Sequence, residues 1–278
     1  MSSPPPAFSF DGAQLDLSSP VDRELLRFVL SQALYGEATG VYCGKSLYSA
    51  RSLEAARFYL RQARQELNHL ELFAQIFRTL ELTPVPAHWV IRLLSAHNNY
   101  YPLKVLMEHA LGEGMVLDIF RDVLMQVLPE SDPRIAEIQK KLASVCREEE
   151  EHIAWGEKET RRILGESPWL RFPFYGILEL QLVLAPLAAR AVGSRAADHP
   201  VLRHLPRFIL HVREKMWRQG QDLGIAPAVR PGLLYRLAAM TAGALLFVRS
   251  QFSRSTSMLE KNYMTELGFG DAPAEPAR

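Results

Sequence analysis

The chain has 278 residues, of which 48% are hydrophobic and 23% are charged, and its formal net charge is +1. This composition is typical of a globular protein, and the small net charge indicates no general attraction to nucleic acid, so we expect no nucleic-acid partner. Two cysteines, Cys43 and Cys146, are too few for a disulfide framework and are expected to be small buried hydrophobic residues. The N-terminus lacks the basic region and apolar run of a secretory signal, so we expect a cytoplasmic protein.

Helical spacing of the apolar residues dominates the chain, and no segment alternates convincingly as a strand would. We predict a flexible leader over residues 1–18. A first helix is predicted to begin at Ser19-Pro20, because a capping serine followed by proline is a typical helix start, and to end near Leu47. A second helix is predicted from about 52 to 80. The proline-bounded segment that follows is a long connection, with a short helix expected inside it.

Two further long helices are predicted, from about 102 to 127 and from about 133 to 164, with the turn LPESDP between them. Four helices joined by a short loop, a long connection and a short loop are typical of an up-down bundle with one crossover between its second and third helices. The sequence therefore predicts an all-α four-helix bundle over residues 19–165.

The rest of the chain is predicted to form a helical extension over 166–262, which packs on the bundle, and a flexible tail over 263–278. Residues 166–278 carry a net charge of +5 and the remainder −4. The extension's helices are expected near 169–193, 200–223 and 231–253. The segments 172–192 and 233–248 are apolar, but charged residues interrupt both, and the second is shorter than the ~20 residues of a membrane span. We expect buried helices, with contact at a membrane interface as the alternative.

The fourth predicted helix carries a polar pair on its apolar face. Its inward stripe consists of residues spaced by three or four: Ile138, Leu142, Val145, Glu149, His152 and Gly156. Burying a carboxylate and an imidazole one turn apart is costly unless something binds them, and a metal ion would offset that cost. Glu150 and Glu151 lie off this stripe and are expected on the solvated side.

The second predicted helix repeats the Glu-x-x-His arrangement, with Glu66 and His69 on one apolar stripe. The first and third helices each place one glutamate, Glu37 and Glu113, among inward apolar residues. Glu108 is the alternative to Glu113, but five residues rotate a helical side chain by about 140°, and Glu113 alone continues the stripe. Two single glutamates and two Glu-x-x-His pairs are the ligand set of a di-iron or di-manganese carboxylate bundle. The predicted metal ligands are Glu37, Glu66, His69, Glu113, Glu149 and His152.

The residue types suit such a site. Carboxylates are hard donors that can bridge two cations and imidazole binds iron well, whereas no thiolate joins the set, which disfavours zinc–thiolate and iron–sulfur centres. A ligating histidine usually donates its other N–H to a carboxylate, carbonyl or water, so Glu148 and Gln65 are each expected beside the histidine of the opposite helix. His109 is predicted to be a polar residue close to the ligands, with a role as a seventh ligand as the alternative.

Four segments resemble the metal-ligand segments of the ferritin-like superfamily: YGEATGVY, ARQELNHLELF, GEGMVLDIF and REEEEHIAWGE. Within that superfamily they resemble the rubrerythrin-like and aldehyde-deformylating-oxygenase-like branches, over residues 19–165. The resemblance implies a dinuclear iron site that reacts with dioxygen or peroxide. Such a site receives its electrons from a donor such as a ferredoxin and its reductase. It does not extend beyond residue 165, so it does not identify the substrate.

We therefore expect an oxidoreductase in which two iron ions, with manganese as the alternative metal, activate dioxygen and oxidise an organic, apolar substrate such as an acyl or lipid molecule. Hydroxylation, desaturation, N-oxygenation and aldehyde deformylation all remain open. A ferroxidase or iron store, and a non-catalytic di-metal protein associated with lipid or membrane, are the alternatives. The basic, apolar extension favours a channel to the metals and a docking surface for a carrier protein or an anionic membrane. A homodimer is also compatible with the sequence.

Overall fold

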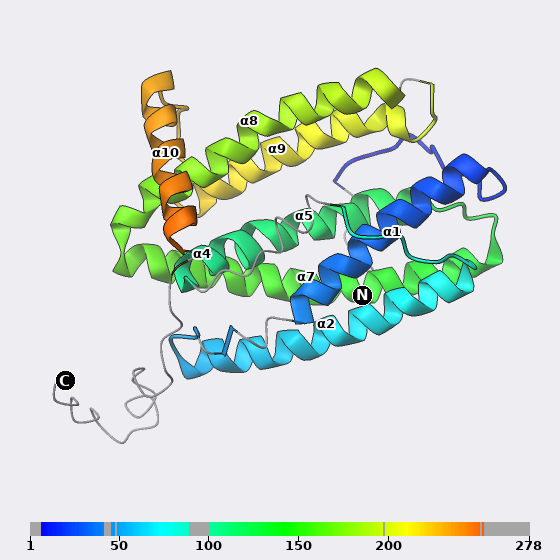
Figure 1. Cartoon of the computed structure of the whole chain (residues 1–278), viewed down its shortest axis with the longest axis horizontal. Coiled ribbons are helices and arrows are strands. Elements are labelled where there is room, and N and C mark those ends of the chain that lie inside the picture. The colour runs from blue at the N-terminus through cyan, green and yellow to red at the C-terminus, as the bar shows by residue number, and fades with distance from the viewer. Residues whose placement is uncertain are drawn as a thin grey trace.

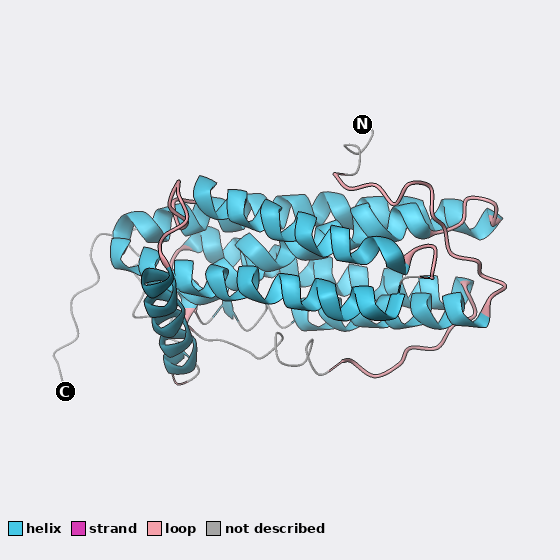
Figure 2. Ribbon diagram, turned by 90° about the horizontal axis from the view of Figure 1, so that it is seen from above, coloured by secondary structure: helices cyan, strands magenta, loops and turns pink. Residues whose placement is uncertain are grey.

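The computed structural model describes residues 7–41, 46–47, 49–88, 100–196, 198–250 and 252, and these residues form helices and connecting loops without a strand (Figure 2). The predicted all-α class is confirmed for this part of the chain. Cys43 and the short helix expected between the second and third long helices, at residues 89–99, lie outside the described residues.

The first two helices begin where the sequence predicts. Helix α1 spans Pro20–Gly40 and α2 spans Leu53–Thr79. The Ser19 side chain accepts a hydrogen bond from the backbone N–H of Asp22, and Ser52 caps α2 in the same way. The predicted end of the first helix near Leu47 is wrong, because α1 ends at Gly40. Glycine is a weak helix former and a common helix end, which the apolar spacing alone did not reveal.

The third long helix is continuous from Tyr101 to Val127 but changes its winding along its length. Its parts are α4 (Tyr101–Lys104), η2 (Val105–Gly112), α5 (Glu113–Asp118), η3 (Ile119–Leu124) and α6 (Met125–Val127). The segments η2 and η3 are π-helical, a winding that is rare and often occurs at functional sites. Helix α7 then spans Pro133–Glu166 and begins with a cap from Asp132.

These helices lie lengthwise beside one another, with α1 against α2, and with α7 between α2 and the π-containing helix (Figure 1). Two apolar clusters fill the interior. One contains Phe58 and Tyr59 of α2 with Ile163 of α7, and the other contains Phe73 of α2 with Val145 of α7. The predicted polar residues of α2 and α7 fall between these clusters in sequence, so a polar layer separates the two apolar ends of the bundle.

The C-terminal extension adds η4 (Pro168–Leu170), α8 (Arg171–Ala196), η5 (Leu202–His204), α9 (Leu205–Asp222) and α10 (Leu233–Ser250). Helices α8 and α9 form a pair along one side of the bundle, and α10 crosses α8 at a steep angle near one end (Figure 1). Phe174 and Leu178 of α8 join the apolar cluster that contains Phe58, so the first half of α8 anchors the extension.

The N-terminal segment differs from the predicted flexible leader from residue 7 onward. Phe10 and Leu15 are buried in the cluster that contains Phe73, and the backbone N–H of Leu15 donates to the carbonyl of Val127 at 2.8 Å. The ring of Phe8 packs edge-on against Phe208 of α9, with the ring centroids 5.5 Å apart. Residues 7–18 therefore form a strap that joins the extension to the third long helix.

Candidate metal centre

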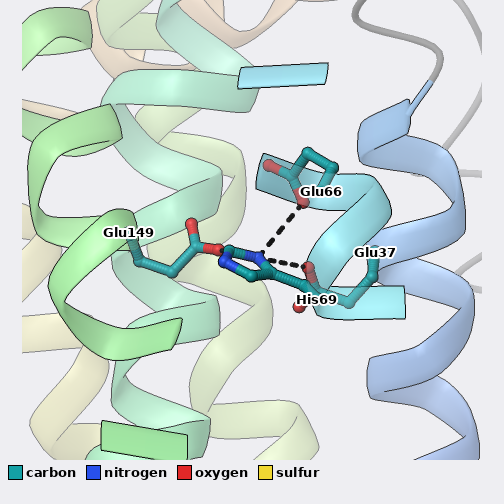
Figure 3. A group of neighbouring side chains, drawn as sticks. All are labelled: Glu37, Glu66, His69 and Glu149. Atoms are coloured by element: carbon teal, nitrogen blue, oxygen red, sulfur yellow. Dashed lines mark hydrogen bonds and ion pairs between the residues drawn. The ribbon is translucent and has the colours of Figure 1, made fainter. Parts of the chain in front are cut away.

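The structure brings the six predicted ligands together in the polar layer of the bundle. They form two overlapping groups in which one ligand atom from each residue lies within 4.8 Å of the others: Glu37, Glu66, His69 and Glu149, and Glu66, Glu113, Glu149 and His152. The first group is drawn in Figure 3. All are buried except Glu113, which is partly exposed. Glu66 and Glu149 belong to both groups, so each could bridge two ions.

Both histidines turn the same ring nitrogen toward the carboxylates. The Nδ1 atom of His69 lies 3.0 Å from a Glu37 oxygen and 3.3 Å from a Glu149 oxygen. The Nδ1 atom of His152 lies 3.2 Å from Glu149 and 3.5 Å from Glu66. A cation among these atoms would replace hydrogen-bond contacts with coordination bonds while the rings keep their direction.

The opposite ring nitrogens face polar partners outside the cluster. The Nε2 atom of His69 lies 3.1 Å from a Glu148 oxygen, and Nε2 of His152 lies 3.1 Å from Oε1 of Gln65. Each partner lies on the helix opposite its histidine, as the sequence predicted. An N–H held in this way fixes the ring orientation and leaves Nδ1 free to bind a metal, which is the usual outer arrangement of ligating histidines.

Glu113 and Glu108 have different surroundings. Glu113 belongs to the second group, whereas Glu108 forms an ion pair with Lys104 at 2.9 Å. The choice of Glu113 rested on ordinary α-helical rotation, but the chain between the two residues is largely π-helical. The residues that follow Gly112 return to α-helical winding at Glu113, and this places its carboxylate in the polar layer.

Burial and charge act strongly on the protonation of the cluster. Burial raises the pKa of Glu37 well above its usual value, although a hydrogen bond with His69 opposes the change. Burial by itself would lower the pKa of His69, but hydrogen bonds to Glu149, Glu37 and Glu66 raise it to about 12. Burial would raise the pKa of Glu149, whereas hydrogen bonds from His152 and His69 lower it to about 2. Without a cation, the cluster therefore retains protons at neutral pH.

Gln62 is a residue of this site that sequence reasoning missed. Its amide is fully buried, and Nε2 donates to Glu113 at 3.0 Å and to Glu66 at 3.3 Å. It also lies 3.4 Å from Nδ1 of His109. The signal was present in the sequence, because Gln62 precedes Glu66 by four residues and therefore shares its helix face.

We expect Gln62→Leu to weaken binding at the group that contains Glu113. The change keeps the side-chain size but removes the donor that holds two carboxylates, and a hydrogen bond to a charged group contributes about 1.5–3 kcal/mol. Titration of the metal-free protein with cobalt, followed by absorption, should show at least about a tenfold loss in affinity for one of two ions. Gln75→Leu, at an exposed position of the same helix, is the control. Equal binding curves for the two variants would show that Gln62 does not position the ligands.

His109 lies beside the cluster but outside both four-residue groups. Its side chain is fully buried, and its Nδ1 is 3.8 Å from a Glu113 oxygen. Burial, followed by the charge of Lys104, lowers the pKa of His109 well below its usual value, so the ring is neutral. Gly156 makes this position possible, because a Cβ there would lie 2.5 Å from the Cβ of His109. The structure thus places His109 as a neighbour of the ligands.

Gly40 leaves room for a ligand that both groups share. A Cβ at Gly40 would lie 2.5 Å from the carboxylate carbon of Glu66, whereas a Cβ at Gly36, one turn earlier on α1, would meet nothing within 4 Å. The carboxylate is the flexible end of a side chain, so it can move aside without disturbing the helices. It would then leave its position among the other ligands.

We therefore expect Gly40→Ala to separate stability from metal binding. Alanine in a helix is favoured over glycine by about 0.5–1 kcal/mol, so the metal-free variant should unfold at or above the wild-type denaturant concentration. Its metal affinity should nevertheless fall at least about tenfold, since Glu66 belongs to both four-residue groups. Gly36→Ala should give the same stability without the loss of affinity. Metal binding by Gly40→Ala at wild-type strength would contradict the placement of Glu66.

Aromatic rings cover one side of the cluster. Phe58 packs edge-on against His152 and His109, with ring centroids 5.9 Å and 5.4 Å away, and stacks on Trp155 at 3.7 Å. Tyr59 is buried beside His109 and Trp155. These rings separate the ligands from water on the side where the helices continue into an apolar cluster.

A cavity of about 650 Å³ lies between α5, α7 and α9. Its lining includes Arg121, Glu150, Glu157, Lys215 and Arg218, and none of the six ligands. Glu150 and Ile153 line it from a different face of α7 than the one that carries Glu149 and His152. Charged side chains make up half of the residues that line this cavity, and none of the predicted ligands borders it, so it is not the channel to the metals that the sequence favoured.

No family model matches this chain, and no curated protein or solved structure matches it significantly.

Proposed function

We propose that this protein is a non-haem di-iron oxidoreductase with a ferritin-like bundle, which activates dioxygen and oxidises an organic, apolar substrate. The observation that carries the proposal is the pair of overlapping four-residue groups, each with one histidine Nδ1 among carboxylate oxygens. The same helices in the same order supply such ligands in di-iron carboxylate bundles.

The donor chemistry fits two divalent ions. Four carboxylates balance four positive charges, and the two shared ones, Glu66 and Glu149, suit bridging positions. Oxygen and imidazole donors suit iron or manganese better than soft metals. Cys146 is buried but belongs to neither group, and burial raises the pKa of its thiol to about 12, so it offers no thiolate. Burial raises the pKa of Glu37, which means that its ionised carboxylate is destabilised in the core. A bound cation would stabilise that carboxylate.

Two bound iron ions would supply the oxidation chemistry, since reaction with dioxygen belongs to the metal pair. The side chains around them have other tasks. Glu148 and Gln65 hold the histidine rings in direction through Nε2, and Gln62 holds the carboxylates of Glu66 and Glu113. Phe58 and Trp155 exclude water from one side of the cluster. A protein or small-molecule electron donor would be needed to return the ions to the ferrous state.

Oxygen consumption by the reduced, iron-loaded protein tests this proposal. The protein is loaded anaerobically with ferrous iron, freed of excess metal and mixed with air-saturated buffer in an oxygen electrode. We expect rapid uptake of about one dioxygen per pair of ions, and further turnover when a reductant is supplied. Glu149→Ala treated in parallel should consume none. The absence of uptake by fully loaded wild type would refute the oxidase. Uptake that instead continues in proportion to added ferrous iron, with assembly into a particle many-fold heavier than one chain, would assign an iron store.

A further inference from the structure

The outer face of α10 is apolar where a soluble helix is normally polar. Exposed residues on this face recur at helical spacing: Leu234, Leu237, Thr241, Leu245 and Val248. Leu234 is 83% exposed and Leu245 is 65% exposed. Phe252 continues the stripe one turn beyond the helix and is also exposed. The inner face is already packed, because Cβ atoms at Gly176 of α8 and Gly243 of α10 would collide with the backbone of the other helix.

Helix α8 carries a second exposed apolar stripe. Leu180, Leu184 and Leu187 are exposed at spacings of four and three, so they form a stripe on its outer side. Trp169 precedes α8 and is 63% exposed, and Tyr235 of α10 packs against Phe172 at 5.2 Å. Tryptophan and tyrosine are the residues that favour the boundary between lipid and water. We call the exposed stripes of α8 and α10 with Trp169 the apolar face.

Two helices are long and apolar enough by composition to cross a membrane: Pro168–Ser194 and Leu233–Ser250. The first is 50% buried and carries the fully buried Glu179, which is bound by Arg230 and Arg236, so α8 is anchored in the protein. The second is only 17% buried, which sets α10 apart from a core helix. A surface helix whose exposed face is mostly apolar is typical of a binding surface for another molecule or a membrane.

The charged residues of α8 and α10 favour a negatively charged binding partner for the apolar face. Arg171, Arg190 and Arg249 are exposed, whereas the sole acidic residue in α8 and α10 is the buried Glu179. Anionic headgroups attract arginine, while leucine and tryptophan enter the acyl boundary.

From the stripes, the packed inner face and the charge, we propose that the apolar face docks this protein on the surface of an anionic lipid bilayer, with α10 lying in the interface. This site is separate from the metal centre and does not depend on the function proposed for it. The steep crossing of α10 over α8 lets one helix lie in the lipid surface while the bundle stays in water (Figure 1).

Vesicle binding by the full-length protein is the test. Vesicles of phosphatidylglycerol and phosphatidylcholine are sedimented with the protein, and vesicles of phosphatidylcholine alone are run beside them. We expect binding to the anionic vesicles that is weaker at high salt. The triple variant Leu234→Gln, Leu237→Gln, Leu245→Gln should bind at least about tenfold more weakly, because three leucines no longer enter the lipid. Its metal content should equal that of wild type.

The control is the variant Val21→Gln, Leu60→Gln, which changes exposed apolar residues on α1 and α2 and should bind vesicles like wild type. Equal vesicle binding by the triple variant and wild type, or no binding by wild type, would overturn the proposal. Sedimentation of the protein without lipid also measures its mass in solution. A wild-type dimer that the triple variant converts to single chains would assign the apolar face to a second copy and would also overturn it.

Discussion

Glu149→Ala is expected to remove both metal ions from the protein. Glu149 belongs to both four-residue groups, and its oxygens lie 3.3 Å from Nδ1 of His69 and 3.2 Å from Nδ1 of His152. Alanine would remove one of the two carboxylates that the groups share, and each histidine would lose an anion that lies within 3.3 Å of its Nδ1 atom. Iron analysis after anaerobic loading and removal of excess metal should therefore give less than about one tenth of the wild-type content. His152→Ala should lose at least the ion of its own group.

Glu151→Ala is the matched control for this experiment, because it removes an exposed carboxylate from the same turns of α7. Glu150→Ala is a second control whose carboxylate pairs with Arg121 at 3.3 Å, outside the cluster. Surface substitutions of this kind change stability by about 0.5 kcal/mol or less, so both variants should load iron like wild type. Loss of iron from Glu151→Ala as complete as that from Glu149→Ala would mean that charge density on α7, rather than the inward groups, binds the metal.

Metal binding is expected to release at least one proton per chain at pH 7. The pKa of His69 is raised to about 12 by its carboxylate neighbours against the effect of burial, and burial raises the pKa of Glu37 well above its usual value. The pKa of His69 lies above neutral pH, so its ring carries both protons at pH 7, yet a metal ligand must be deprotonated. A cation therefore displaces one proton from His69, and each displaced proton makes the affinity rise by about tenfold per pH unit.

A pH indicator in weakly buffered solution measures the release directly. Ferrous or cobalt ion is added to the metal-free protein, and the acid produced is compared with that from Glu149→Ala, which should release almost none. Affinities measured at pH 6 and pH 8 should differ by at least about a hundredfold for one displaced proton. Tight binding with no acid released and equal affinities at the two pH values would contradict the protonation of the cluster.

The sequence predicted well which polar side chains face the core, because these residues lie on long helices with strict apolar periodicity. A carboxylate or histidine on such a stripe must point inward, so helical spacing alone was enough to place Glu66, His69, Glu149 and His152 in the core. The spacing also puts Gln62 on the helix face of Glu66, but its role could not be predicted from its own helix, because that role depends on Glu113 from another helix.

Other features depend on tertiary structure and could not be predicted from one segment at a time. The π-helical segment Val105–Gly112 packs against α7, where Gly156 leaves room for the backbone of His109 and Ala110, and this contact between distant segments has no local signal. The N-terminal strap is ordered because Phe10 and Leu15 find an apolar cluster formed by distant residues. Helix α10 was expected to be buried, but only 17% of it is buried in the protein. Its apolar composition does not show whether protein or lipid contacts its outer face.

Metal stoichiometry of the wild-type protein tests the dinuclear site most directly. The full-length chain is stripped of metal, loaded anaerobically with ferrous iron, freed of excess and analysed by elemental analysis against a protein concentration from amino-acid analysis. Two overlapping groups that share Glu66 and Glu149 predict two iron ions per chain, and manganese supplied instead of iron should reach the same ratio. A ratio of one or less that repeated loading does not increase would contradict a dinuclear centre in this bundle.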